Sequence, residues 1–67
     1  MAVANNLKQI LKDKGIKQSW LAEQVDITPT TLGNIVHNRF NTSLEVALRI
    51  AIVLNIRVEE IFRYVKE

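Results

Sequence analysis

Residues 26–38 of this 67-residue chain read DITPTTLGNIVHN, and this stretch decides the fold. Thr28 before Pro29 is typical of a helix start, because a threonine hydroxyl can cap a free first-turn amide and proline at the first helical position sacrifices no hydrogen bond. Large aliphatic residues then recur at helical spacing, namely Leu32, Ile35 and Val36. The sequence therefore predicts a short helix from Pro29 to about His37, with that apolar side buried.

The opposite side of this predicted helix is uncharged and consists of small or polar residues: Thr30, Gly33, Asn34 and His37. Short hydrogen-bonding side chains on a narrow helix suit contact with base edges inside a groove of duplex DNA. A face that is only solvated has the same composition, so both interpretations stay open at this point.

The composition excludes several kinds of site. With no cysteine and one histidine, the chain can form neither a disulfide nor a cysteine-ligated zinc site, and we predict no metal, no cofactor and no small-molecule ligand. No catalytic motif is found, so we expect no enzyme. No apolar run reaches transmembrane length and the first residues lack a secretory signal, so we expect a cytoplasmic protein without membrane contact.

The net charge of +2 is unevenly distributed. Residues 1–43 hold five basic and three acidic side chains, whereas residues 44–67 hold four of each. The positive excess thus accompanies the polar helix face, as expected of a surface turned toward phosphates. Many domains without a nucleic-acid partner share such a bias, so the charge alone indicates little.

The rest of the chain predicts four more short helices and no strand, hence an all-α fold of five helices in one domain, residues 1–67, with its core over about 6–62. The other helices are expected from about Val3 or Asn5 to Lys14, from about Gln18 to Val25, from about Ser43 to Leu54, and from Val58 to about Tyr64. Thr42 or Ser43 can cap the 43–54 helix, which is apolar on nearly all sides and belongs in the middle. Helix ends are expected at Gly15, Asp26, Asn38 and Asn55, the first three with left-handed backbone.

Two of these helices, 18–25 and 29–37, are joined by a tight turn, as in a helix-turn-helix. The motifs around them are Lys14-Gly15-Ile16, Gln18-x-x-Leu21-Ala22, Thr28-x-x-Thr31-Leu32-x-Asn34-Ile35, Ser43-Leu44-Glu45 and Ala51-x-x-Leu54-Asn55-Ile56. On these motifs the chain resembles the phage repressor/Cro-type (Xre-like) helix-turn-helix DNA-binding domains. The resemblance implies a lambda-repressor-like fold and a regulator, in most cases a repressor. It also implies a homodimer that reads a near-palindromic double-stranded operator from the major groove.

The resemblance also implies roles for individual residues. Base contacts are expected from Pro29, Thr30, Gly33 and Asn34. Phosphate contacts are expected from Lys17, Gln18, Thr31, His37, Asn38, Arg39 and Asn41. A two-fold dimer interface on the last helix and the loop before it would use Ile52, Arg57, Val58, Ile61 and Tyr64. For Lys17 the phosphate role is our own hypothesis, because a lysine at the N-cap of a helix opposes the dipole and suggests a functional compensation.

The chain departs from the family pattern at two pairs of positions. Relatives often carry glutamine or arginine at the position of Pro29 and serine or a similar residue at that of Gly33. Pro29 cannot hydrogen-bond a base, so base reading would rest on Asn34, with help from Thr30. Relatives also often carry an inward ion pair at the positions of Leu11 and Val36. Loss of both charges is tolerated whereas loss of one is costly, so we expect these two side chains to pack near each other.

Several interpretations stay open. His37 suits the helix dipole or a phosphate better than chemistry, Trp20 packs against Ile16 or meets a partner, and Phe40 anchors its loop or stacks on a base. Two further functions are compatible with the same scaffold. One is an antitoxin that binds both DNA and a toxin, and the other is a protein-interaction module.

Overall fold

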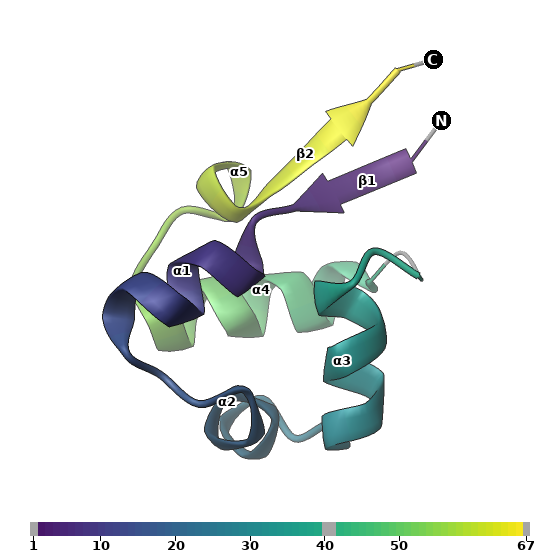
Figure 1. Cartoon of the computed structure of the whole chain (residues 1–67). Coiled ribbons are helices and arrows are strands. Elements are labelled where there is room, and N and C mark those ends of the chain that lie inside the picture. The colour runs from purple at the N-terminus through teal and green to yellow at the C-terminus, as the bar shows by residue number, and fades with distance from the viewer. Residues whose placement is uncertain (1, 40–41, 67) are drawn as a thin grey trace.

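The computed structural model describes residues 2–39 and 42–66. Along this part of the chain, five helices follow a first short strand and precede a second one (Figure 1). The elements are β1 (Ala2–Asn5), α1 (Leu7–Lys14), α2 (Gln18–Gln24), α3 (Pro29–Val36), α4 (Leu44–Leu54), α5 (Val58–Ile61) and β2 (Phe62–Val65). None of the helices in this part is long and apolar enough to cross a membrane.

The expectation of an all-α fold is wrong at both ends of the chain. β1 and β2 pair antiparallel, with Ala2 opposite Val65 and Asn5 opposite Phe62. The first helix therefore begins later than expected and the last ends earlier. Aromatic and β-branched residues in 62–65 favour a strand, and the N-terminal segment supplies the partner that a lone strand needs. Figure 1 shows this ribbon projecting from the helices, with both termini at its far end.

The helix ends follow the sequence closely. Gly15, Asp26 and Asn38 have φ values of 67°, 60° and 59°, which confirms the predicted left-handed turns, and Asn55 ends α4 in the same conformation. Thr28 caps α3, its Oγ1 accepting a hydrogen bond from the Thr31 amide at 3.1 Å.

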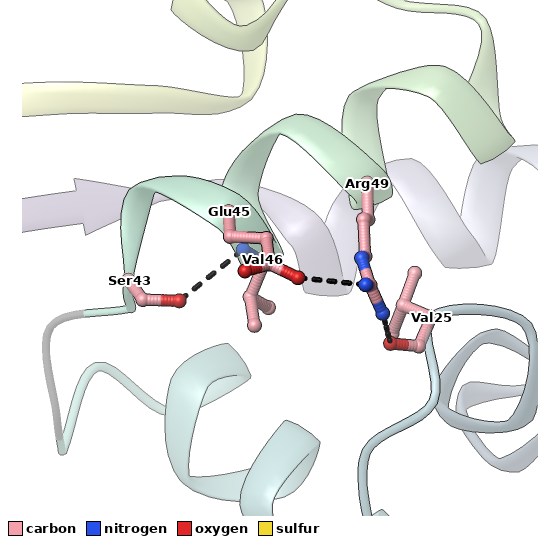
Figure 2. A network of polar contacts seen from close by, with 5 residues as sticks. All are labelled: Val25, Ser43, Glu45, Val46 and Arg49. Atoms are coloured by element: carbon pink, nitrogen blue, oxygen red, sulfur yellow. Dashed lines mark hydrogen bonds and ion pairs between the residues drawn. The ribbon is translucent and has the colours of Figure 1, made fainter.

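Of the two predicted caps of α4, Ser43 is the one used. Its Oγ accepts a hydrogen bond from the Val46 amide at 3.2 Å (Figure 2). In the same helix, Arg49 pairs with Glu45 at 2.6 Å and donates to the backbone oxygen of Val25 at 3.4 Å. This second bond ties α4 to the end of α2 and so helps to fix the α2–α3 unit on the central helix.

The core lies between the helices and consists of aliphatic side chains. Its buried members are Leu7, Leu11, Leu21, Ala22, Val25, Leu32, Ile35, Val36, Ile50, Ala51, Leu54 and Ile61. The predicted apolar side of α3 is thus buried. Leu11 and Val36 both belong to this cluster, and their packing against each other stays a prediction. α4 differs from the prediction, because one side of it remains exposed to solvent.

Candidate nucleic-acid interface

α2 and α3 pack against each other through their apolar sides and are joined by residues 25–28. The Ile27 amide bonds the Ala22 oxygen at 3.0 Å across the left-handed Asp26, which makes the turn tight. Burial of Leu32, Ile35 and Val36 fixes the rotation of α3 about its axis. The polar stripe predicted from the sequence must therefore face away from the core.

The four predicted base-contact residues lie together on this outward side of α3. Pro29 and Thr30 are exposed in the first turn, and Gly33 and Asn34 are half-buried one turn later. Thr31 is exposed beside them, its hydroxyl oxygen accepting a hydrogen bond from the Thr28 hydroxyl at 2.8 Å. These neutral groups form a narrow surface with donors and acceptors, which is the chemistry needed at base edges.

Gln18, the first residue of α2, reaches this surface. A Cβ built on Gly33 would lie 3.4 Å from Gln18 Nε2, so the glutamine amide lies directly over the middle of α3. The sequence predicted a phosphate contact for Gln18 but not its contact with α3. The structure thus brings the N-terminus of α2, where free amides carry partial positive charge, next to the polar stripe.

Arg39 and Asn34 are also connected. The Arg39 amide donates to the Asn34 backbone oxygen at 2.9 Å, and Arg39 Nη1 donates to Asn34 Oδ1 at 3.4 Å. The guanidinium thereby orients the carboxamide that was predicted to read a base. Its other donors remain exposed beside α3 and could reach a phosphate.

Cationic and polar groups border both ends of the stripe. Lys17 is exposed in an extended conformation at the N-cap of α2, and within the described residues its side chain makes no capping hydrogen bond. His37 and Asn38 are exposed at the C-terminal end of α3. Asn41, predicted as a phosphate contact, and Phe40, predicted either to anchor the loop or to stack on a base, lie outside the described residues.

The residues predicted for a dimer interface differ in exposure. Ile52 and Tyr64 are strongly exposed and Arg57 is exposed, whereas Val58 is half-buried against the core. Ile61 is wrong as an interface residue, because only 2% of it is exposed and its side chain fills the core. Trp20 is 45% exposed and lines a hollow with Ile16 at the end of α1, in agreement with the predicted neighbourhood.

Sequence reasoning missed Asn5, which joins β1 to the end of α3. Asn5 Nδ2 donates to the Ile35 oxygen at 2.7 Å and to Asn38 Oδ1 at 3.2 Å. The signal in the sequence was weak, consisting of a polar pair, Asn5 and Asn6, before an apolar helix. Without the strand there was no reason to place this side chain beside residues that lie 30 and 33 positions further along the chain.

Comparisons with known proteins agree with this geometry. The chain resembles the structure of a candidate DNA-binding protein from Bacteroides fragilis, with a TM-score of 0.83 and 26% identity over 91% of this chain and 98% of that one. It also has the fold of a transcriptional regulator from Listeria innocua, with a TM-score of 0.77 and 23% identity over 91% of this chain and 57% of that one. No curated protein matches the chain. The family model for Cro/C1-type HTH DNA-binding domains matches residues 6–67. The chain therefore belongs to the family of Cro/C1-type helix-turn-helix DNA-binding domains, as its motifs predicted.

Proposed function

We propose that this protein is a sequence-specific transcription regulator, acting as a repressor, whose α2 and α3 form the helix-turn-helix. The observation that carries the proposal is the outward stripe of α3, which is neutral, accessible and bordered by Lys17 and Arg39. A narrow polar helix flanked by cations fits the major groove, whose floor offers donors and acceptors and whose rims are phosphates. Repression follows if the bound site overlaps a promoter, and such a regulator works in the cytoplasm.

Sequence-specific contacts to bases and non-specific contacts to phosphates would be made by different residues. Asn34 and Thr30 would hydrogen-bond base edges, Pro29 would touch a thymine methyl group, and Gly33 would let the α3 backbone come close. The groups around them would hold phosphates: Lys17, Gln18, Thr31, His37, Asn38 and Arg39, with Asn41 as a further residue of the same loop. Phosphate contacts set the position of the protein, whereas base contacts select the sequence.

The regulator would bind as a homodimer, for which α4 offers a better surface than α5. Leu44, Leu48 and Ile52 are 72%, 44% and 77% exposed and recur every fourth residue along one side of the helix. This stripe is symmetric about Leu48. Two copies related by a two-fold axis can therefore pack Leu48 on Leu48 and Leu44 on Ile52, as an isologous contact requires.

Charge supports a second copy as the occupant of that stripe. Residues 44–67 hold four cations and four anions, so two such halves do not repel each other, whereas the positive excess stays in the half that would face DNA. Arg49 and Glu45 beside the stripe already neutralise each other. Of the residues first predicted for the interface, Ile52 remains in the revised surface, and Arg57, Val58 and Tyr64 lie outside it.

Selection of bound sequences from a random pool of duplex DNA tests the proposal. The expected result is a near-palindromic consensus with half-sites about 34 Å apart, as a two-fold helix-turn-helix dimer requires. Binding at low salt should weaken steeply as salt rises. Purified protein that binds no duplex at low ionic strength would overturn the DNA-binding role. If the protein instead binds DNA as a monomer, the α4 stripe would be the contact surface for a different protein, as in the antitoxin alternative.

A further inference from the structure

We propose that Asn5 is a positioning residue for DNA binding, which holds the turn after α3 in the conformation that presents Asn38 and Arg39. The inference rests on the proposed function, because it concerns the phosphate contacts of that same surface. Asn5 lies in the strand that sequence analysis did not predict, and it would touch no DNA itself.

The evidence is a set of four hydrogen bonds made by one residue. Asn5 Nδ2 donates to the Ile35 oxygen at 2.7 Å and to Asn38 Oδ1 at 3.2 Å, and the Asn5 amide donates to the same Asn38 oxygen at 3.1 Å. Asn5 Oδ1 accepts from the Leu7 amide at 3.1 Å. Both ends of the carboxamide are thus used, so its orientation is fixed.

The turn that Asn5 holds needs such support. Asn38 has φ of 59°, a left-handed conformation that asparagine adopts more readily than most residues, and most readily where its side chain is hydrogen-bonded. Two backbone bonds close the turn, from the Asn38 amide to the Ile35 oxygen at 3.0 Å and from the Arg39 amide to the Asn34 oxygen at 2.9 Å. Asn5 adds bonds to the Asn38 side chain and to the Ile35 oxygen. It therefore holds the left-handed residue and the last turn of α3 at once.

Arg39 follows this turn directly, and its guanidinium bonds the Asn34 side chain. The position of Asn38 therefore sets where the arginine side chain leaves the backbone and how it meets Asn34. A looser turn would cost both the phosphate contact of Arg39 and the orientation of Asn34. The effect of losing Asn5 should thus appear in binding, and in the local opening of the turn.

Asn5 also connects the ribbon to α3. It stands opposite Phe62 in the sheet, and the Asn6 amide donates to the Ile61 oxygen at 3.1 Å. The two ends of the chain are therefore bonded to each other and, through Asn5, to the C-terminal end of α3. Figure 1 shows β1 and β2 extending beyond the helices on the side where α3 ends.

The test compares Asn5→Asp with Asn6→Asp. The first variant keeps the acceptor for the Leu7 amide, removes both side-chain donor bonds and sets a carboxylate against two oxygens. The second adds the same charge one residue away, at an exposed position that makes no side-chain cap within the described part of the chain. Any general repulsion between the added charge and DNA is common to both variants.

Amide hydrogen exchange in the DNA-free protein is measured first. We expect exchange of the Asn38 and Arg39 amides to be about tenfold faster in Asn5→Asp than in wild type, because two hydrogen bonds that oppose opening are lost. In Asn6→Asp the same two amides should exchange at the wild-type rate. Unchanged exchange in Asn5→Asp would overturn the inference, whether or not the protein binds DNA.

Affinity for the selected duplex is measured next. Asn5→Asp should bind about tenfold more weakly and with a salt slope lower by about one, as expected when one phosphate contact is lost. Faster exchange with unchanged affinity would also overturn the inference. If wild type itself binds no duplex, the proposed function fails together with the DNA role of Asn5, and the exchange data still report separately on the turn. If Asn5→Asp does not fold, Asn5→Ser and Asn6→Ser supply the same comparison without a charge.

Discussion

The amide of Gln18 lies over Gly33, with Nε2 3.4 Å from the place where a β-carbon of residue 33 would stand. Gly33 is inside α3, where glycine normally weakens a helix. A β-carbon there would stand at the edge of ordinary van der Waals contact with the flexible end of Gln18, so this contact alone does not require a glycine. The proposed reason for Gly33 is the close approach of the α3 backbone to DNA, in which case stability favours alanine at residue 33 and binding favours glycine.

Gly33→Ala should separate these two demands. Alanine favours the helix by up to about 1 kcal/mol, and the flexible end of Gln18 can move away from the added methyl group at little cost. We expect the melting temperature to rise while affinity for the selected duplex falls. Thermal melts and electrophoretic shifts on the same preparation check both parts. Unchanged affinity would mean that neither the close backbone approach nor the Gln18 position matters for binding.

Asn34→Ala and Arg39→Gln should have different effects on specificity. Loss of a bidentate asparagine contact removes about 1–3 kcal/mol of discrimination at one base pair. Loss of the arginine charge should weaken binding to both selected and scrambled duplexes and reduce the salt slope by about one, with a smaller additional loss on the selected duplex because Arg39 no longer orients Asn34. Titration of each variant against both duplexes gives the two patterns. Equal losses on both duplexes for Asn34→Ala would exclude it as a base-reading residue.

Lys17→Ser should stabilise the protein and weaken its binding. Lys17 has the extended backbone of an N-cap without a capping side chain in the described structure, and serine at such a position contributes about 1 kcal/mol. The lost charge should lower the salt slope of DNA binding by about one. Chemical denaturation and shifts at two salt concentrations measure the two effects. A slope that stays the same would remove Lys17 from the phosphate contacts.

Most of the helical scaffold could be predicted because its signals are local. Thr28 and Pro29 start α3, and left-handed backbone at Gly15, Asp26 and Asn38 ends three helices, all through interactions within a few residues. The spacing of Leu32, Ile35 and Val36 then oriented α3 and its polar stripe correctly. These positions needed no knowledge of how distant segments meet.

The strands and their consequences could not be predicted in this way. β1 and β2 are four residues each and form because the two ends of the chain meet, which no local pattern reports. The position of Asn5 beside Ile35 and Asn38 depends on that pairing. Helical periodicity also suggested that the last helix would run on to about Tyr64, and tertiary pairing overrode it.

Val36→Glu should destabilise the fold by about 3–5 kcal/mol, because it places an unpaired charge in the core beside the buried Leu11 cluster. The double variant Leu11→Arg/Val36→Glu should recover part of that loss if the two side chains are close enough to pair. Denaturant unfolding of the single and double variants measures the coupling. If the double variant loses as much stability as the two single variants together, the two residues are too far apart to pair.

Leu48→Glu should break the proposed homodimer, because it puts two carboxylates at the centre of the symmetric α4 contact. Ile52→Glu should do the same at its edge. Trp20→Glu is the matched control, since Trp20 is 45% exposed and Leu48 44%, but Trp20 lies in α2 and outside the α4 stripe. Because Trp20 lines a hollow with Lys17, the stoichiometry of this control on DNA is compared and not its affinity. Light scattering coupled to size exclusion, with and without the selected duplex, gives the oligomeric state. We expect two copies of wild type, or of Trp20→Glu, to bind one full site. Each α4 variant should bind a half-site as a single copy. Dimers that persist in Leu48→Glu would move the interface away from α4 and toward the ribbon of β1 and β2.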